Sequence, residues 1–446
     1  METVAKLSKS LRSGKRDAVE LAQEVLASIK ACDDQAIFID VLEERALAEA
    51  KLARKRLRAK KPASLLDGVP IGWKDIFDVE GRNTTAASLV LKSDAPAKAD
   101  AALVAAGKRA GMVMIGTLNM TEFAYSGIGL NPHYGTPRNP HSKVHRSPGG
   151  SSSGSGVVVA KGLLPVAIGT DTGGSIRIPA SFNGVVGYKS STGHYPMAGV
   201  FPLSPTYDTL GPLAQTVEDC VLVDALLRGL KALKIKAGTV KGRQFIVPTN
   251  VVFDDVEDAV QVNFDAALSR ISRAGGKIKR VAFPAFDAIL KLVATRGNIL
   301  GAEALHIHAA RVNGPDAEHM DKRVVQRIKL AEKMTAVDLV EVMRQRKQLM
   351  LETTALIGDA IVICPTTPHV GMPIAPLEAD MEEFFRVNAK TLRNTMLGNF
   401  LDWCGLSIPS GFDAEAMPTG FMMSAPHGRD ADILSTGLSL EQLVRG

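Results

Sequence analysis

The sequence predicts an α/β protein, with a large sheet covered by helices. From Leu66 onward, short apolar runs of strand length alternate along the chain with helix-like segments. This alternation is typical of a sheet whose strands are connected through helices. The composition agrees, because aliphatic residues are plentiful and aromatic residues make up only 5% of the chain. With 46% hydrophobic and 22% charged residues, the chain is an average globular protein, which excludes a disordered chain, a collagen and a coiled coil.

The first 60 residues are predicted to be helical. One apolar stripe at helical spacing consists of Leu21, Val25, Leu26 and Ile29. Asp17 precedes this stripe as its expected N-cap. A second helix is expected from Val41 to Pro62, with acidic residues first and the densest basic run, residues 51–61, at its end. That order suits the helix dipole, so we interpret the basic run as a solvated helix face rather than an RNA-binding patch.

The rest of the chain supplies the expected strands and the helices between them. Apolar runs of strand length occupy residues 69–73, 113–117, 163–169, 244–247 and 360–365. Helices are expected at residues 101–110 and 155–161. The lysine-rich stretch 231–241 is a candidate junction, and the part after it, through about residue 352, is more helical, with an amphipathic pattern over residues 316–346.

Charge and cysteine usage limit the partners and the compartment. The net charge of +6 is modest for 446 residues, so a nucleic-acid partner is not expected. The four cysteines (Cys32, Cys220, Cys364 and Cys404) are far apart, which disfavours a zinc site or a disulfide framework. The first residues lack the apolar core of a signal peptide, and no window has the 18 or more apolar residues of a membrane helix. The sequence therefore predicts a reduced, soluble, cytoplasmic protein.

The stretch from Ser147 to Lys189 carries the chemistry, and three interpretations of it compete. Its glycines would suit a phosphate-binding loop, but a P-loop needs Gly-Lys-Ser/Thr where Val157 and Val158 follow Gly156. The dinucleotide pattern of three spaced glycines after a strand is also missing. Nucleotide binding is therefore disfavoured.

The second interpretation is a nucleophile elbow, because residues 150–154 match Gly-x-Ser-x-Gly with Ser152 at the centre. An elbow needs an apolar strand just before it, whereas residues 143–150 form a polar turn. It also needs a histidine and an acid, and no histidine of the chain has a suggestive setting. In a serine- and glycine-rich loop this match carries little weight.

The third interpretation uses both glycine- and serine-rich clusters. The apolar run 163–169 leads into residues 170–175, Thr-Asp-Thr-Gly-Gly-Ser, where adjacent glycines can aim backbone N–H groups at one oxyanion. Ser175 could then attack a carbonyl held by those groups, provided a base activates it. Lys74 ends another apolar run, and burial would lower its pKa toward the neutral base form. On its own segment, a surface lysine after an edge strand is the favoured interpretation of Lys74.

Several separate blocks, in one order, resemble the amidase signature family of serine hydrolases. These blocks are residues 69–75, 119–123 with 131–140, 148–154, 171–179 and 208–212, followed more weakly by 403–430. The resemblance implies a large twisted mixed β-sheet sandwiched between helices. It also implies a single domain over residues 1–446, in place of the two or three domains that the length suggests. Within that domain we expect an N-terminal helical segment (1–62), a signature core (66–230) and a variable part that completes the sheet (241–446).

The resemblance also implies a Ser–cis-Ser–Lys triad. Ser175 would be the acyl-forming nucleophile, Lys74 the general base and Ser151 the bridging serine, so that Ser152 and Ser153 only shape the loop. Thr172, Gly173 and Gly174, with Ser175 itself, would supply the oxyanion N–H groups. No metal and no organic cofactor are required.

Substrate contacts follow less directly from the resemblance. The acyl pocket is expected near Tyr125 and Ser126 and in the variable region after residue 276. Asp171 would order the glycine turn. Arg177 is a candidate for binding an anionic substrate, and a structural ion pair is the alternative for it.

Two functions share this triad. The first is a stand-alone amidohydrolase that acts on a small amide or urea-like compound, with a homodimer possible. The second is the A subunit of a glutamine-dependent tRNA amidotransferase. In the motif of that subunit, the base lysine and its aspartate are followed by asparagine. Here Lys74-Asp75 is followed by Ile76, Phe77 and Asp78, which resembles the free-standing amidases. The sequence favours the hydrolase.

Overall fold

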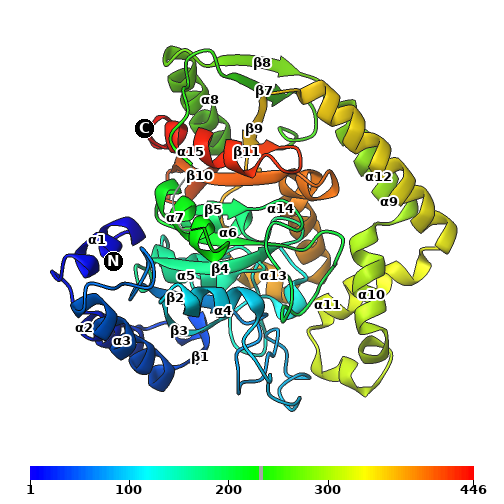
Figure 1. The fold of residues 1–446 in the computed structure, drawn as a ribbon. Helices are drawn as coiled ribbons and strands as arrows, with labels where there is room; N and C mark the ends of the chain where they lie inside the picture. The colour runs from blue at the N-terminus through cyan, green and yellow to red at the C-terminus, as the bar shows by residue number, and fades with distance from the viewer. Residues whose placement is uncertain (231–234) are drawn as a thin grey trace.

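One mixed β-sheet connects the two ends of the molecule. The computed structural model describes residues 1–230 and 235–446, and in these residues the sheet has 11 strands in the order β1-β3-β2-β4-β6-β5-β10-β11-β9-β7-β8 (Figure 1). The strands are β1 (Phe38–Val41), β2 (Pro70–Lys74), β3 (Val113–Leu118), β4 (Val166–Asp171), β5 (Val186–Lys189), β6 (Thr209–Ala214), β7 (Gln244–Pro248), β8 (Lys277–Val281), β9 (Ile361–Pro365), β10 (Cys404–Phe412) and β11 (Pro418–Ala425).

The helices lie on both faces of this sheet. They are α1 (Val4–Arg12), α2 (Ala18–Lys30), α3 (Glu43–Arg58), α4 (Ala102–Arg109), α5 (Ser153–Ala160), α6 (Arg177–Asn183), α7 (Val217–Leu227), α8 (Asp258–Arg273), α9 (Pro284–Arg296), α10 (Ile299–Val312), α11 (Lys322–Lys329), α12 (Ala336–Ile357), α13 (Ala375–Ala379), α14 (Met381–Phe400) and α15 (Asp430–Arg445). The α/β class and the amidase-type mixed sheet between helices are confirmed.

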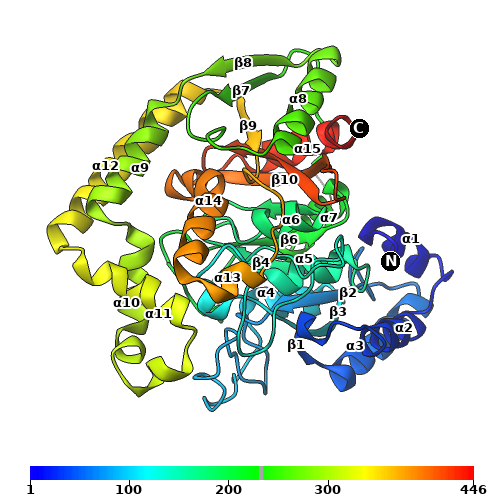
Figure 2. The same cartoon turned by 180° about the vertical axis from the view of Figure 1, so that it is seen from behind.

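Neighbouring residues of β10 show how the two layers are divided. Leu406 contacts Gly437 in α15, while Gly405 faces Arg177 at the start of α6. Because successive side chains of a strand point to opposite faces, α15 and α6 cover opposite faces of the sheet. Helix α7 packs with α15, and α5 and α14 pack with α6. The front and back views show these two layers (Figures 1 and 2).

Strand order brings the chemically interesting segments to one edge. β2 pairs in parallel with β4, with Gly72 opposite Ala167 and Trp73 opposite Ile168. The carboxyl ends of parallel strands meet at the same edge of a sheet. Lys74 at the end of β2 therefore lies beside Thr170 and Asp171 at the end of β4.

The predicted strands are all present, displaced by up to three residues. β2, β3, β4, β7 and β9 correspond to the five apolar runs, and α4 and α5 to the two expected helices. The amphipathic stretch 316–346 is divided between α11 and α12, with the short 3₁₀ helix η4 (Leu330–Lys333) between them. The predicted junction at 231–241 falls partly outside the described residues, since 231–234 are not described.

The N-terminal prediction needs one correction. Asp17 caps α2 by accepting from the N–H groups of Val19 and Glu20, as expected. Helix α3, however, begins at Glu43 rather than Val41, because residues 38–41 form strand β1 on the edge of the sheet. Residues 36–42 are apolar except for Asp40, which is compatible with a strand as well as with a helix, and tertiary pairing with β3 decides the strand.

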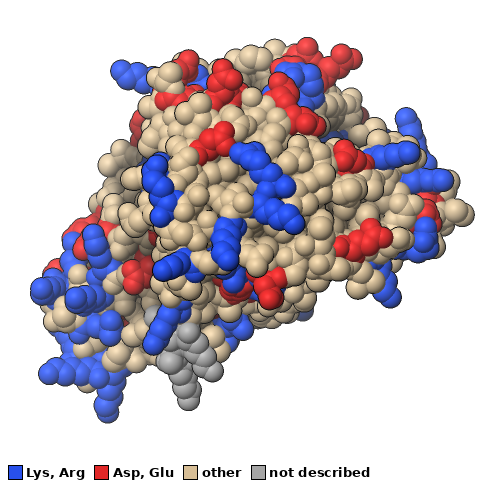
Figure 3. Space-filling model, turned by 90° about the horizontal axis from the view of Figure 1, so that it is seen from above, with Lys and Arg blue, Asp and Glu red and all other residues tan. Residues whose placement is uncertain are grey.

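The basic run at the end of α3 is a solvated helix face. Arg54 and Arg58 lie within ion-pair distance of Asp17, and Arg56 pairs with Asp67. On the face seen in Figure 3, basic and acidic side chains are interspersed. No helix among the described residues is long and apolar enough to cross a membrane.

Helices α9 to α12 form an arm along one side of the sheet (Figures 1 and 2). α9 packs along α12, and α10 packs on α11 and on η4. Strands from all three predicted segments of the chain share the one sheet. On that basis we propose that residues 1–446 form a single domain.

Candidate active site

A buried lysine and a buried serine meet at the edge where β2 and β4 end. The Nζ atom of Lys74 lies 2.8 Å from Ser151 Oγ and 2.7 Å from Thr170 Oγ1, and donates to both hydroxyls. Lys74 and Ser151 are both fully buried. The contact joins residues 77 positions apart in the chain. It pairs a potential base with a hydroxyl away from bulk solvent.

Burial decides the protonation of Lys74. Desolvation lowers the pKa of Lys74 to about 7, against the raising effect of the negative charges of Asp208 and Asp171. A buried ammonium is costly, and its neutral form becomes accessible near neutral pH. The interpretation favoured on this segment alone, a surface lysine after an edge strand, is therefore wrong, because β2 lies between β3 and β4 and Lys74 is fully buried.

The serine-rich loop, residues 148–154, is held by close backbone contacts. The Gly150–Ser151 peptide bond is cis. A side chain at Gly150 would approach the backbone nitrogen of Gly129 to 2.6 Å, so only glycine fits there. The Ser151 carbonyl accepts from the Thr121 N–H at 3.0 Å. These contacts fix the position of Ser151.

Ser152 has a structural position. Its N–H donates to the carbonyl of Ser175 at 3.3 Å, and its Oγ interacts with the backbone of Thr170. Ser152 is fully buried just before α5. This geometry favours the loop-forming role over the nucleophile elbow.

Ser175 differs from the other two residues in its exposure. It stands just before α6 and is 4% exposed, whereas Lys74 and Ser151 are 0% exposed. The hydrogen bond from Ser152 to its carbonyl places it directly beside the serine-rich loop. Among the described residues no hydrogen bond joins the hydroxyls of Ser151 and Ser175, and the partial exposure of Ser175 leaves it accessible to a substrate, as a nucleophile requires.

The geometry of the glycine turn before Ser175, residues 172–174, differs from the expectation that Gly174 supplies an oxyanion N–H group. The Gly174 N–H donates to Asp171 Oδ1 at 2.9 Å, so it is not free to bind an oxyanion. Within the described residues, no acceptor engages the N–H groups of Thr172, Gly173 or Ser175. Gly174 has φ +132, and a side chain there would collide with Thr395 Oγ1. Gly174 is therefore required for the backbone path rather than as a donor.

Asp171 orders this turn, as expected from the sequence. Besides Gly174, it accepts from the N–H of Ile176 at 3.2 Å and from Asn399 Nδ2 at 2.8 Å. Burial alone would raise the pKa of Asp171, but the charge and hydrogen bonds of Arg177 hold that pKa well below its usual range. The carboxylate stays ionised and acts as the organising anion of the loop.

Arg177 is part of the same ion pair, which argues against a contact with substrate. Its Nε and Nη2 atoms donate to the two carboxylate oxygens of Asp171 at 3.0 and 2.9 Å, and Nη2 also donates to Asn399 Oδ1 at 2.6 Å. The side chain is 1% exposed. The structural ion pair, the alternative for this residue, accounts for these contacts.

Four residues of the site were given no role from the sequence. Thr170 contacts Lys74, and Thr395 donates to the Gly173 carbonyl at 2.7 Å. Asp208 accepts from Thr172 Oγ1 at 2.6 Å, and burial raises the pKa of Asp208 to about 6. The fourth residue, Asn399, contacts both Asp171 and Arg177. Thr395 and Asn399 lie in α14, more than 200 positions from the residues they contact, so local pattern gives no signal for them.

Tyr125 and Ser126 belong to a segment that contacts the serine-rich loop. The Gly150 N–H donates to the Gly127 carbonyl at 2.8 Å, which joins the two segments. Ser126 Oγ interacts with Asn388 Oδ1 in α14 at 3.0 Å. Arg327 of α11 donates to the Tyr125 carbonyl at 2.5 Å. The arm and α14 therefore both contact the segment expected to form the acyl pocket.

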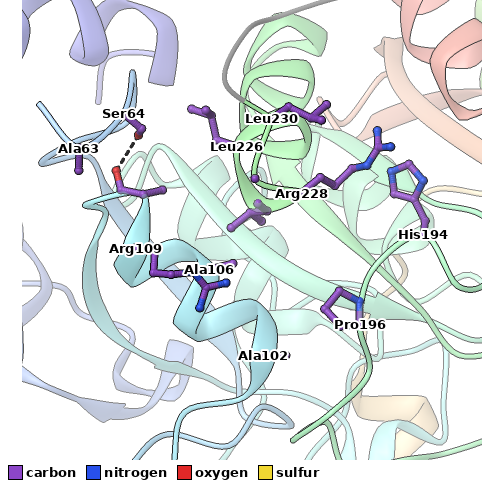
Figure 4. Close-up of a pocket in the computed structure, with 13 residues that line it drawn as sticks. Ala63, Ser64, Ala102, Ala106, Arg109, His194, Pro196, Leu226, Arg228 and Leu230 are labelled. Carbon is purple, nitrogen blue, oxygen red and sulfur yellow. Dashed lines mark hydrogen bonds between the residues drawn. The ribbon is translucent and has the colours of Figure 1, made fainter.

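A cavity of about 700 Å³ on another part of the surface contains none of these residues (Figure 4). It lies between α4 and α7, where Ser64 Oγ donates to the Ala110 carbonyl at 2.6 Å. Its histidine, His194, is paired with Asp224 at 2.7 Å. Among the described residues, no group of three or more His, Cys, Asp or Glu side chains is arranged to hold a metal ion.

Known proteins are similar to this chain in sequence and in fold. The Amidase family model matches residues 20–434. A 2-amino-5-chloromuconic acid deaminase of Comamonas testosteroni is 33% identical and covers 88% of the chain and 87% of its own length. The A subunit of the glutamyl-tRNA(Gln) amidotransferase of Pseudomonas putida is 29% identical over 99% of the chain and 97% of its own length. A crystal structure of an amidase has a TM-score of 0.88 at 29% identity, covering 99% of this chain and all of that one.

The fold, the site and these relatives define the class of the protein: it is an enzyme, a hydrolase that acts on carbon–nitrogen amide bonds. Within that class, the chain belongs to the amidase signature family.

The buried Asp171–Arg177 pair gives a prediction about stability. Replacing Arg177 by methionine leaves the Asp171 carboxylate buried without its counter-charge, which should lower the free energy of unfolding by about 3–5 kcal/mol. The exposed pair of Arg386 with Glu383 supplies the control, and Arg386→Gln should leave the free energy of unfolding nearly unchanged because solvent screens that pair. Urea denaturation monitored by circular dichroism measures both. Equal stability of the two variants would contradict this role of Arg177.

Proposed function

We propose that this protein hydrolyses a small amide or urea-like compound through an acyl-enzyme on Ser175. The observation that carries the proposal is the 2.8 Å contact between Lys74 Nζ and Ser151 Oγ in a fully buried setting beside Ser175. Lys74 would be the general base, Ser151 the relay and Ser175 the nucleophile. The low pKa of Lys74, which burial produces, supports a neutral amine in that role.

In the first half-reaction the proton of Ser175 passes through Ser151 to the neutral amine of Lys74. Ser175 Oγ forms a bond to the amide carbon, and the carbonyl oxygen becomes an oxyanion. The free N–H groups of Thr172, Gly173 and Ser175 would stabilise that charge. The proton then returns through Ser151 to the amide nitrogen, the C–N bond breaks, and ammonia or an amine leaves.

In the second half-reaction water takes the place of the leaving group. Its proton travels to Lys74 by the same relay as its oxygen attacks the acyl carbon. The bond to Ser175 Oγ breaks, and the proton returns to that oxygen as the acid is released. Protons and bonds balance over the cycle, and no oxidant or reductant is needed.

The alternative is the A subunit of a glutamine-dependent tRNA amidotransferase. It is supported by a relative of that name that matches almost the whole chain. The deaminase has the higher identity, 33% against 29%, and Ile76 and Phe77 follow Lys74-Asp75 as in free-standing amidases. We therefore favour the stand-alone hydrolase, in the cytoplasm, with a small amide as its partner and a homodimer as its possible assembly. Four free cysteines, three of them buried, agree with a reducing compartment.

Ser175→Ala should abolish amide hydrolysis. Loss of the nucleophile costs on the order of 10⁴- to 10⁶-fold in kcat in serine hydrolases. Ser152→Ala, at the neighbouring buried serine, should keep activity within about tenfold of the wild type. Ammonia release from a panel of small amides measures both, and the melting temperature verifies folding. The elbow interpretation replaces ours if the Ser152 variant is inactive and the Ser175 variant turns over normally.

The rate should rise with pH through the pKa of Lys74. A base that must be neutral is active above its pKa, so kcat/KM should level off above about pH 7 and fall about tenfold per pH unit below it. Lys74→Met should be severely impaired over the whole range. A pH–rate profile from about pH 5.5 to about pH 9 provides the test. Full activity of Lys74→Met, or an acid limb that disappears on replacing a histidine, would count against the relay.

The purified chain should release ammonia from an amide without a partner subunit or ATP. The measurement compares the chain alone, with and without glutamine, on a broad panel of primary amides and urea derivatives. If no amide in the panel is hydrolysed, but glutamine is hydrolysed once a partner subunit is added, the amidotransferase alternative replaces the hydrolase.

A further inference from the structure

A cavity of about 440 Å³ opens where the arm meets the segment expected to form the acyl pocket. Tyr125 forms one wall, and Arg327 of α11 stands over it. The other walls come from the end of α9, the start of α10, η4 and the start of α12, through residues such as Asn298 and Lys333. We call it the arginine cavity.

The charges lining the arginine cavity do not balance. Arg296 and Asp338 pair with each other at 2.8 Å and cancel. Arg327 and Lys333 also line the cavity, and within residues 1–230 and 235–446 no carboxylate lies within ion-pair distance of either. The cavity therefore carries an excess of positive charge.

The guanidinium of Arg327 is held in place while most of its donors stay free. It lies 4.3 Å from the centre of the Tyr125 ring, and Nη1 donates to the Tyr125 carbonyl at 2.5 Å. A guanidinium has five N–H donors in a planar fork that matches a carboxylate. No other acceptor among the described residues engages this fork. Burial lowers the pKa of Arg327, as expected for a cation without an anionic partner.

The start of α10 adds to the positive electrostatic potential of the arginine cavity. Asn298 caps this 14-residue helix by accepting from the Gly301 N–H at 2.6 Å, and both residues line the cavity. The amino end of a helix carries a partial positive charge that favours an anion.

The Tyr125 segment connects the arginine cavity to the serine-rich loop. Tyr125 is two residues from Gly127, whose carbonyl accepts from the Gly150 N–H of the serine-rich loop. Leu392 of α14 lies within contact distance of positions on both Gly127 and the oxyanion turn residue Gly173. The Tyr125 segment and Leu392 thus link the wall of the cavity to the serine-rich loop and the glycine turn.

We propose that the arginine cavity binds a carboxylate of the substrate, so that the preferred substrate is an amide carrying an acid group at the end away from the scissile bond. The proposal rests on the proposed function at Ser175. It assigns recognition of the anion to Arg327, in place of Arg177, whose guanidinium is already occupied by Asp171 and Asn399. Arg327 thereby acts as the specificity residue, with Lys333 at the rim and the start of α10 as secondary contributions.

The test compares monoamides of dicarboxylic acids with neutral amides of the same length. Malonamate, succinamate, glutaramate and adipamate form the acidic series, and propionamide, butyramide, pentanamide and hexanamide the neutral one. Ammonia release should show kcat/KM at least about tenfold higher for one or two acidic lengths than for their neutral counterparts. Hydrolysis of both series without a preference for the acid overturns the proposal and leaves the amidase function intact.

Variants separate recognition from structure. Arg327→Met should lower kcat/KM about 10- to 100-fold for the preferred acidic amide, mainly through KM, and far less for the neutral one. Arg327→Lys, which keeps the charge, should recover part of the loss. Arg344→Gln on α12, whose arginine pairs with Glu341 at the surface, is the control and should change neither substrate class. An equal loss on both classes with a lowered melting temperature would make Arg327 a structural residue and overturn the proposal.

A binding measurement keeps the test independent of turnover. Calorimetric titration of Ser175→Ala protein with succinate, glutarate and adipate should show binding that Arg327→Met weakens at least about tenfold. Binding without hydrolysis of any amide by the wild type would support the arginine cavity and contradict the proposed function. The absence of binding, together with Ser175-dependent hydrolysis of neutral amides, would contradict the cavity alone.

Discussion

The burial of one amine governs the architecture of the site. Lys74 ends β2, an interior strand between β3 and β4, and has no exposed surface, so its charged form is penalised by desolvation. The structure compensates this cost only in part, through the charges of Asp208 and Asp171 and the hydroxyls of Ser151 and Thr170. The neighbouring elements must therefore approach closely enough to exclude water. The parallel register of β2 with β4 and the glycine contacts of the serine-rich loop meet that requirement.

A second buried group, the Asp171–Arg177 pair, shapes the turn that presents Ser175. Asp171 accepts from three backbone N–H groups around the turn, which forces the chain to wrap around a carboxylate. Arg177 keeps that carboxylate ionised, and Asn399 of α14 contacts both members of the pair. A buried charge pair is weak evidence for stability, but here it fixes which N–H groups face inward and which remain free. The free groups of Thr172, Gly173 and Ser175 are those left over after Asp171 has taken its share.

In our proposals, the reaction chemistry and the binding of the substrate's acid group lie in different parts of the molecule. The lysine, the two serines and the glycine turn belong to the ends of the interior strands β2 and β4 and to the loops and helices beside them. The arm of α9 to α12 approaches from one side and contacts the Tyr125 segment through Arg327 (Figures 1 and 2). The arm also contacts the rest of the molecule through Glu303, which accepts from Ser204 and Thr206, and through the Asp321 N–H, which donates to Glu122.

The sequence by itself determined the class of the fold and the candidates for chemistry. Alternating apolar runs predicted β2, β3, β4, β7 and β9, because a buried strand needs a local apolar pattern. The expected positions of Lys74, Ser151 and Ser175 came from the resemblance of short blocks, in which glycine and serine must occupy fixed positions. Strand β1 lies in a largely apolar run, residues 36–42, that was assigned to the helical N-terminal segment. The charged β8 has no such run, and its pairing with β7 decides it.

Tertiary structure decided what the candidates can do. Gly174 was expected to be an oxyanion donor, but in the folded chain its N–H donates to Asp171. Arg177 was a candidate for substrate binding, but its guanidinium donates to the same carboxylate. Thr395 and Asn399 reach the site from a helix more than 200 residues away, and Arg327 stands over Tyr125 across a similar separation. A sequence records which polar groups exist, whereas their availability depends on which partners the folded chain brings within hydrogen-bond distance.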